Sequence, residues 1–154
     1  MIRNVGEKQG VENVAVQNIV KKLLLKHKTR DPFMIAEAEN IIVQEGDLPP
    51  ITKGMAVKIL RRKYIVINHT LHSYEKKYVC AHELGHHLLH DVQNHRFILE
   101  NTLNPNGKYE REANEFAACL LIDPTIISDD DTIESIAVKA NVPVELVKHY
   151  KRCI

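Results

Sequence analysis

The chain has 154 residues, of which 44% are apolar and 27% charged, so it is long enough to bury one ordinary hydrophobic core. It contains 21 Lys and Arg residues against 20 Asp and Glu, and neither sign forms a long block, which argues against nucleic acid as a direct partner. No apolar run approaches the length of a membrane span, and the N-terminus lacks the apolar stretch of a secretory signal, so we expect a cytoplasmic protein without a membrane partner.

Two helices are predicted at the start of the chain. Apolar residues recur at helical spacing between Val11 and Lys28, which predicts the first helix. Asp31 and Pro32 suit the cap and first position of a second helix, which we expect to continue to Gly46. Prolines and a glycine then predict a loop over 47–54.

A β-hairpin is predicted after this loop. Residues 55–60 and 64–68 are short, rich in β-branched side chains and separated by a polar Arg-Arg-Lys, so we expect two antiparallel strands. Ser73 suits the N-cap of a helix that runs from Tyr74 to about His90.

Three further helices are predicted in the remaining chain. After a polar segment at 101–107, one helix passes through 109–122 and ends near Pro124. Two short helices follow at 132–140 and 143–152. We therefore expect a single domain over residues 1–154, divided into N-terminal helices and a loop (1–54), a central part with the strands and two motif helices (55–124), and a C-terminal helix pair (125–154). Cys80, Cys119 and Cys153 lack paired spacing, so we expect them to be reduced.

The helix predicted at 74–90 carries a pattern with metal-binding chemistry. His82 and His86 are four residues apart, which places both imidazoles on one face about 6 Å apart along the axis, so they can share one tetrahedral metal. Glu83 lies beside that face, where it can take a proton from water. This is the HEXXH pattern, which typically binds Zn²⁺. The metzincin pattern is excluded, because Leu89 and Val92 stand where it requires glycine and histidine.

A catalytic zinc site of this kind needs a third protein ligand and an open position for water. The helix predicted over 109–122 supplies Glu110, Glu112 and Glu115. The second and third lie about 200° and 140° around the helix from the first, so the three cannot serve interchangeably. We favour Glu110, because Asn114 lies one turn further on the same face and can bond to a ligand histidine.

The two motifs together, "YVCAHELGHHLLH" and "YEREANEFAACLL", resemble the ImmA/IrrE family of metallopeptidases. The resemblance extends from the strand at 64–68 to Pro124, about the central half of the chain. It implies an α+β fold that is mostly helical and zincin-like, of the gluzincin type, with a small antiparallel sheet ahead of the HEXXH helix. One departure is visible: the family typically reads Leu-Leu-Met-Pro after the second motif, whereas this chain has Ile122 and an inserted Asp123, which affects the expected wall of the cleft.

The resemblance also implies site residues and a substrate. Zinc would be held by His82, His86 and Glu110, with Glu83 as the general base. The substrate would be a helix-turn-helix repressor in the cytoplasm, cleaved to relieve repression of a mobile element, prophage or stress regulon. One alternative is a zincin-like binding module that inactivates the repressor without proteolysis. Another is a DNA-binding regulator that uses the C-terminal helix pair, although its second helix is only weakly basic.

Further side chains are weighed for secondary roles. His87 projects about 140° around the helix from His82 and should miss the metal. His90 is close in azimuth to His86, so these two could pair at a metal, but that pair would leave Glu83 without a role, and we expect His90 to cap or pack the helix end. An extended substrate is expected to pair with the strand Tyr64, Ile65, Val66, Ile67 and Asn68. Four tyrosines are candidates for stabilising an oxyanion, and the sequence does not choose among Tyr64, Tyr74, Tyr78 and Tyr109.

Overall fold

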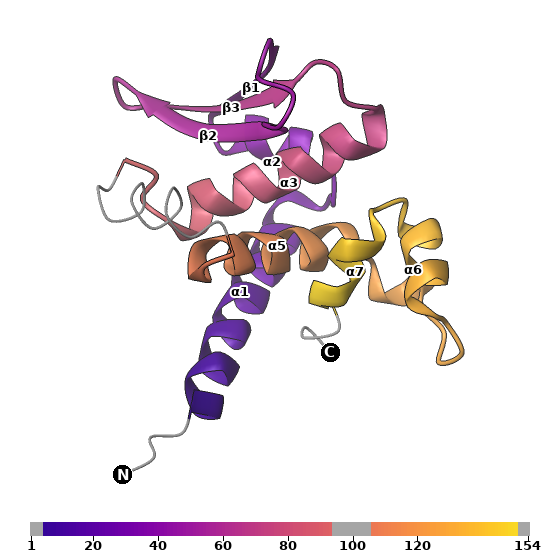
Figure 1. The fold of residues 1–154 in the computed structure, drawn as a ribbon. Helices are drawn as coiled ribbons and strands as arrows, with labels where there is room; N and C mark the ends of the chain where they lie inside the picture. Colours follow the sequence, from indigo (N-terminus) through magenta and orange to yellow (C-terminus); the bar gives the residue numbers. More distant parts are fainter. Residues whose placement is uncertain (1–4, 94–105, 151–154) are drawn as a thin grey trace.

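The computed structural model describes residues 5–93 and 106–150 and has the predicted α+β architecture. Its elements are α1 (Val5–His27), α2 (Pro32–Ala38), β1 (Ile41–Gly46), β2 (Gly54–Ile59), β3 (Arg62–Asn68), α3 (Ser73–Leu89), α5 (Lys108–Leu121), the short 3-10 helix η1 (Pro124–Ile126), α6 (Ile133–Ala140) and α7 (Val144–Tyr150). The sheet lies on α2 and α3 at one end of the molecule, and α5 packs on the other side of α3 (Figure 1). Most of the predicted polar segment at 101–107 falls outside the described residues.

The chain departs from the predicted second helix near Asn40. Asp31 caps α2 as expected, because its Oδ1 accepts the backbone N–H of Phe33 at 2.9 Å. The helix nevertheless ends at Ala38, and Asn40 takes a left-handed conformation with φ of 59°. Residues 41–46 then form β1, so the prediction of a helix to Gly46 is wrong. The three β-branched residues that open this segment favour a strand.

The sheet is small and mixed. Its strand order is β1-β3-β2, with β2 antiparallel and β1 parallel to the central β3. The predicted hairpin is confirmed, and Leu60 and Arg61 form its turn with φ values of 50° and 70°, which suit a tight two-residue connection. The parallel strand β1 is a departure from the sequence prediction, in which residues 41–46 continue the second helix.

Close packing joins α3 to α5. A Cβ atom at Gly85 of α3 would lie only 3.0 Å from Cδ1 and 3.2 Å from Cβ of Phe116 on α5. Phe116 is fully buried in the main hydrophobic core, so its ring has little freedom to give way. Glycine at position 85 therefore sets how closely the two helices approach.

Arg30 closes the C-terminal end of α5. Its Nη1 donates to the backbone oxygens of Cys119 and Leu120 at 3.1 and 3.0 Å, which satisfies carbonyls that the helix end leaves free. Its Nε lies 3.6 Å from Oδ2 of Asp123, whose Oδ1 caps η1, and Ile122 is fully buried. The two residues that depart from the family pattern thus close a helix end and fill the core, and neither lines the cleft described below.

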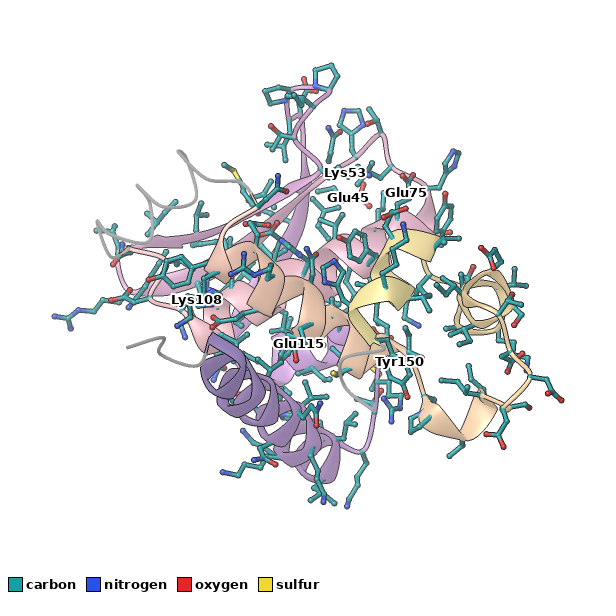
Figure 2. The ribbon with its side chains drawn as sticks, turned by 60° about the horizontal axis from the view of Figure 1, so that its bottom comes forward. Glu45, Lys53, Glu75, Lys108, Glu115 and Tyr150 are labelled. Atoms are coloured by element: carbon teal, nitrogen blue, oxygen red, sulfur yellow. The ribbon has the colours of Figure 1, made fainter. Side chains whose placement is uncertain are left out.

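Of the two C-terminal helices, α7 packs against α5, and α6 packs against α7. Asn141 adopts a left-handed conformation between α6 and α7, and Leu146 and Val147 of α7 are buried. Figure 2 shows α5 between α1 and α7, with Glu115 of α5 and Tyr150 of α7 labelled. No helix in the described part of the chain is long and apolar enough to span a membrane.

The cysteines differ in state. Cys80 on α3 is a free thiol and fully buried, and burial raises its pKa well above the usual range. Cys119 on α5 is disulfide-bonded, so the prediction of reduced cysteines is wrong for this residue.

We predict that Gly85→Ala destabilises the fold. Alanine improves helix propensity by about 1 kcal/mol, but the added methyl group must displace a buried ring, and overpacking costs about 1–3 kcal/mol. The free energy of unfolding, measured by urea denaturation, should fall by about 1 kcal/mol. The double variant Gly85→Ala/Phe116→Leu should lose less stability than the sum of the losses in the two single variants, because the smaller side chain makes room for the methyl group. Val138→Ala, on the exposed face of α6, is the control and should have little effect. A stabilised Gly85→Ala variant would show that the two helices can separate freely.

Candidate metal centre

Two histidines of α3 and one glutamate of α5 converge on the same point. Nε2 of His82 lies 3.0 Å from Oε2 of Glu110, and Nε2 of His86 lies 3.0 Å from Oε1 of the same carboxylate. The four-residue spacing brings both imidazoles to one face of α3, and the packing of α5 supplies the carboxylate that spans them. The sequence predicted these three residues as partners, and the structure brings them together.

The chemistry of this group suits a metal ion. Its ligand atoms all lie within 4.8 Å of one another, and among residues 5–93 and 106–150 no other group of three or more His, Cys, Asp or Glu side chains meets that condition. Two imidazole nitrogens and a carboxylate oxygen are the donors found in catalytic sites that keep one position open for water. The group could therefore hold a divalent metal.

The outer nitrogen of each histidine is also engaged. Nδ1 of His82 lies 2.9 Å from Oδ1 of Asn114, and the hydroxyl of Tyr78 donates to the same oxygen at 3.1 Å. Because an amide oxygen only accepts, the proton of a neutral His82 sits on Nδ1 and its Nε2 carries the lone pair. Nδ1 of His86 lies 3.1 Å from Nδ1 of His90. Both Nε2 atoms thus face Glu110, which is the orientation that a metal ligand requires.

The other two glutamates of α5 lie elsewhere, as their azimuths require. Oε2 of Glu112 lies 2.6 Å from Nε2 of His90, on the far side of His86 from Glu110. Glu115 is buried in the helical layer and does not belong to the donor group. His87 points toward the sheet, where its Nε2 donates to the backbone oxygen of Tyr64 at 2.8 Å.

Glu83 lies beside the donor group in a shielded position. It is 8% exposed, and burial raises its pKa to about 7, with a further increase from Glu110 and opposing effects of His82 and of a hydrogen bond with the Ala56 backbone. A carboxyl group with this pKa can both accept and release a proton near neutral pH. Gly54 permits the close approach of β2, since a Cβ there would clash with Val79 and lie 3.5 Å from the Glu83 side chain.

The electrostatics of the three converging groups favour an ionised carboxylate. Burial acts to raise the pKa of Glu110, but hydrogen bonds to His82 and His86 and their charges outweigh it and hold the pKa well below the usual range. Burial also opposes charging of the histidines. The bond to Glu110 overcomes this effect at His82, whose pKa is raised, whereas burial prevails at His86, whose pKa is lowered. The carboxylate of Glu110 therefore stays ionised although its side chain is only 24% exposed.

A cleft of about 600 Å³ opens over these residues. One wall consists of α3 and α5 residues, and the other consists of Ile51–Lys53 and the first residues of β2. The prediction that residues 64–68 offer a free strand edge is wrong, because β3 is paired on both sides. The strand beside the cleft is β2, which is an edge strand among the described residues. The strand order depends on β1, which the sequence pattern predicts as part of a helix.

Of the four tyrosines considered for an oxyanion, Tyr78 lines the cleft in the described structure. Burial, followed by the charges of Glu110 and Glu83, raises its pKa to about 12, so its hydroxyl stays a hydrogen-bond donor. Tyr74 is 42% exposed at the start of α3, and the ring of Tyr109 packs edge-on against His90 with centroids 4.6 Å apart. Tyr64 lies in the central strand β3.

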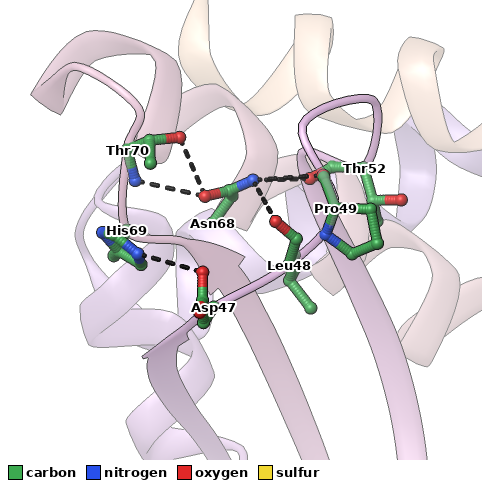
Figure 3. Close-up of polar contacts among 7 residues, drawn as sticks. All are labelled: Asp47, Leu48, Pro49, Thr52, Asn68, His69 and Thr70. Atoms are coloured by element: carbon green, nitrogen blue, oxygen red, sulfur yellow. Dashed lines mark hydrogen bonds and ion pairs between the residues drawn. The ribbon is translucent and has the colours of Figure 1, made fainter.

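Asn68 at the end of β3 holds the loop that forms the rim of the cleft (Figure 3). Its buried amide donates to the backbone oxygens of Thr52 at 3.0 Å and Leu48 at 3.3 Å. Its Oδ1 accepts from the backbone N–H and the hydroxyl of Thr70 at 3.2 and 2.9 Å. Asn68 was expected to belong to a substrate-binding strand, whereas its side chain fixes the wall of the cleft opposite α3 and α5. The sequence gives one indication of this role, which is an asparagine at the end of a predicted strand in a chain whose preceding loop, 47–54, contains two prolines.

Comparison with known proteins gives matches over most of the chain. Residues 36–150 match a peptidase family described as the IrrE N-terminal-like domain. The chain is 40% identical over 135 residues to uncharacterized immunity region protein 2 of Bacillus phage phi105, which covers 85% of each chain. It is 25% identical over 146 residues to metallopeptidase ImmA of Bacillus subtilis strain 168, which covers 88% of this chain and 83% of that protein.

We predict that Asn68→Ala loosens the rim loop. The substitution leaves buried backbone oxygens without their donor, which should lower the free energy of unfolding by about 1–3 kcal/mol. Amide hydrogen exchange should accelerate over 47–53, while α3 and α5 keep their protection. Asn68→Asp should be at least as damaging, because a carboxylate cannot donate to these carbonyls. His69→Ala, which removes an exposed contact to Asp47 in the same loop, is the matched control and should have little effect. If residues 47–53 of Asn68→Asp exchange at the wild-type rate, Asn68 does not hold the rim loop.

Proposed function

The chain belongs to the ImmA/IrrE family of metallopeptidases, and on that premise we propose that it is a zinc-dependent endopeptidase that makes selective cuts in a helix-turn-helix repressor. The observation that carries the proposal is the convergence of His82, His86 and Glu110 beside the buried Glu83 in an open cleft. A site with two imidazoles, a carboxylate ligand and a separate carboxyl base suits peptide hydrolysis and has no evident use in a purely structural role.

The residues of this chain have separate roles in the proposed mechanism. His82, His86 and Glu110 would hold the metal, and Asn114 would orient His82 through Nδ1. Zinc, when bound, would supply Lewis-acid chemistry that activates water for attack and polarises the peptide carbonyl. Glu83 takes a proton from the attacking water and then delivers it to the nitrogen of the leaving amine.

Two further features support peptide hydrolysis in this cleft. The hydroxyl of Tyr78 lies beside the proposed ligands, and by turning its proton from Asn114 toward the scissile carbonyl it would stabilise the oxyanion that develops there. An extended substrate segment would lie along the edge strand β2, between Gly54 and Ala56 on one side and α3 on the other. In this assignment β2 replaces β3 as the substrate-binding strand.

The proposed substrate and location follow from the relatives and the fold. One relative is an immunity region protein of a phage, which supports a repressor of a prophage or other mobile element as the substrate. We propose that cleavage relieves repression, and that it takes place in the cytoplasm where such a repressor binds DNA. The buried face of α7 packs on α5, and α6 packs on α7, which supports a role of this helix pair in closing the core over a role in reading DNA.

Metal analysis tests the proposed ligands. Purified wild-type protein should contain one zinc ion per chain, and His82→Ala and Glu110→Ala should each lose it, because two remaining ligands bind weakly. Glu145→Ala, an exposed glutamate on α7, is the matched control and should keep the metal. Full zinc occupancy in Glu110→Ala would remove Glu110 from the ligand set.

Substitution of Glu83 separates the enzyme from a binding module. Glu83→Gln keeps the shape of the side chain but cannot accept the proton, so zinc should remain bound while cleavage slows by about 10²–10⁴-fold. The measurement is the appearance of repressor fragments on co-expression, with relief of repression followed in the same cells. If Glu83→Gln relieves repression as well as wild type, the protein acts by binding without proteolysis. Salt-dependent binding of the isolated protein to operator DNA would instead support the DNA-binding alternative.

A further inference from the structure

A chain of hydrogen bonds leads from His86 through His90 to Glu112. Nδ1 of His86 lies 3.1 Å from Nδ1 of His90, and Nε2 of His90 lies 2.6 Å from Oε2 of Glu112. His90 follows the end of α3, and its side chain is 3% exposed, while Glu112 comes from α5 and is 18% exposed. These hydrogen bonds are therefore largely shielded from water, which strengthens them.

The order of donors along this chain runs in one direction. A carboxylate only accepts, so Glu112 requires the proton of a neutral His90 on Nε2. Nδ1 of His90 is then an acceptor, which draws a proton to Nδ1 of His86, while in the metal-free protein the Glu110 carboxylate competes for a proton on Nε2 of the same ring. A neutral His86 with its proton on Nδ1 presents a lone pair on Nε2, which is the atom that faces Glu110.

The ring of His90 is itself held in place. It packs edge-on against Tyr109 with centroids 4.6 Å apart, and the His90 backbone N–H donates to the backbone oxygen of His86 at 3.0 Å. The helix end and the aromatic contact thus restrict the imidazole that Glu112 orients. The neighbouring His82 is oriented differently, by the amide oxygen of Asn114.

We propose that His90 and Glu112 are positioning residues that keep His86 in the tautomer and orientation needed to bind the metal through Nε2. This inference rests on the proposed function, since it concerns the same metal site. It assigns a role to a histidine and a glutamate that the HEXXH pattern does not include. Partners of this kind beyond the ligand typically change metal affinity by 10- to 100-fold.

The experiment compares three variants in the full chain. Glu112→Ala removes the acceptor, and His90→Phe keeps the aromatic contact with Tyr109 but removes both ring nitrogens. Glu112→Gln keeps an oxygen that can accept the proton of His90, so it tests rescue by a conservative change. His69→Phe, a histidine that is largely exposed and distant in sequence from α5, is the matched control.

Two measurements are made on each variant. Competition with a chromogenic chelator gives the dissociation constant for Zn²⁺. Long-range proton–nitrogen NMR correlations in the metal-free protein report which ring nitrogen of His86 carries the proton. The second measurement does not depend on the metal or on peptidase activity, and circular dichroism checks that each variant is folded.

The expected result is a loss of zinc affinity of about 10- to 100-fold in Glu112→Ala and His90→Phe, with the His86 proton moving from Nδ1 toward Nε2. Glu112→Gln and His69→Phe should remain close to wild type in both measurements. Wild-type affinity and tautomer in Glu112→Ala would overturn the inference, and this variant suffices if His90→Phe does not fold. A wild-type protein that binds no zinc would overturn the proposed function instead, and the tautomer in the metal-free protein would still decide whether Glu112 and His90 position His86.

Discussion

The contact between Gly85 and Phe116 is the constraint on which the rest of the site depends. The two histidines come from α3, but the carboxylate that spans them comes from α5, so the separation of these helices decides whether the three side chains meet. Contacts that orient the histidines from outside also cross this interface, since Asn114 of α5 bonds to His82 and Glu112 of α5 bonds to His90. The buried ring of Phe116, packed against Gly85, fixes the separation of the two helices. The polar side chains of the site can then adjust only by changing rotamer.

The charges in the cleft explain why a cation suits it. Glu110 and Glu83 lie close together in a shielded place, and two ionised carboxylates there repel each other. The imidazoles beside Glu110 hold its pKa low, while burial raises the pKa of Glu83 to about 7. Their surroundings thus give the two acids different pKa values, so that Glu110 is suited to carry charge and Glu83 to exchange a proton near neutral pH. A divalent cation among the three converging donors would balance the charge that the first carries.

Local patterns in the sequence were sufficient for much of the fold and the geometry of the site. The spacing of His82 and His86, and of Glu110 and Asn114, follows from helical repeat alone, and the second motif brought the carboxylate to the histidines as expected. Predictions failed where the outcome depends on partners distant in the chain. The β-branched residues of 41–46 favour a strand, but the segment also fits a helix end until pairing with β3 decides, and that pairing determines which strand borders the cleft. The contact of His90 with Glu112 depends likewise on how α5 crosses α3.

The two walls of the cleft are stabilised by different interactions, which bears on how substrate selection can vary. The wall of α3 and α5 is part of the main hydrophobic core, so a substitution there disturbs packing and the histidines together. The opposite wall has Ile51 at its rim, 91% exposed, and is held through the amide of Asn68 and the pairing of β2 with β3. Substitution of an exposed rim side chain removes no buried contact and leaves these backbone bonds intact. The wall of α3 and α5, which carries the proposed metal ligands, is therefore constrained by the fold. The side chains of the rim can change to suit a different protein substrate at little cost to the proposed metal site.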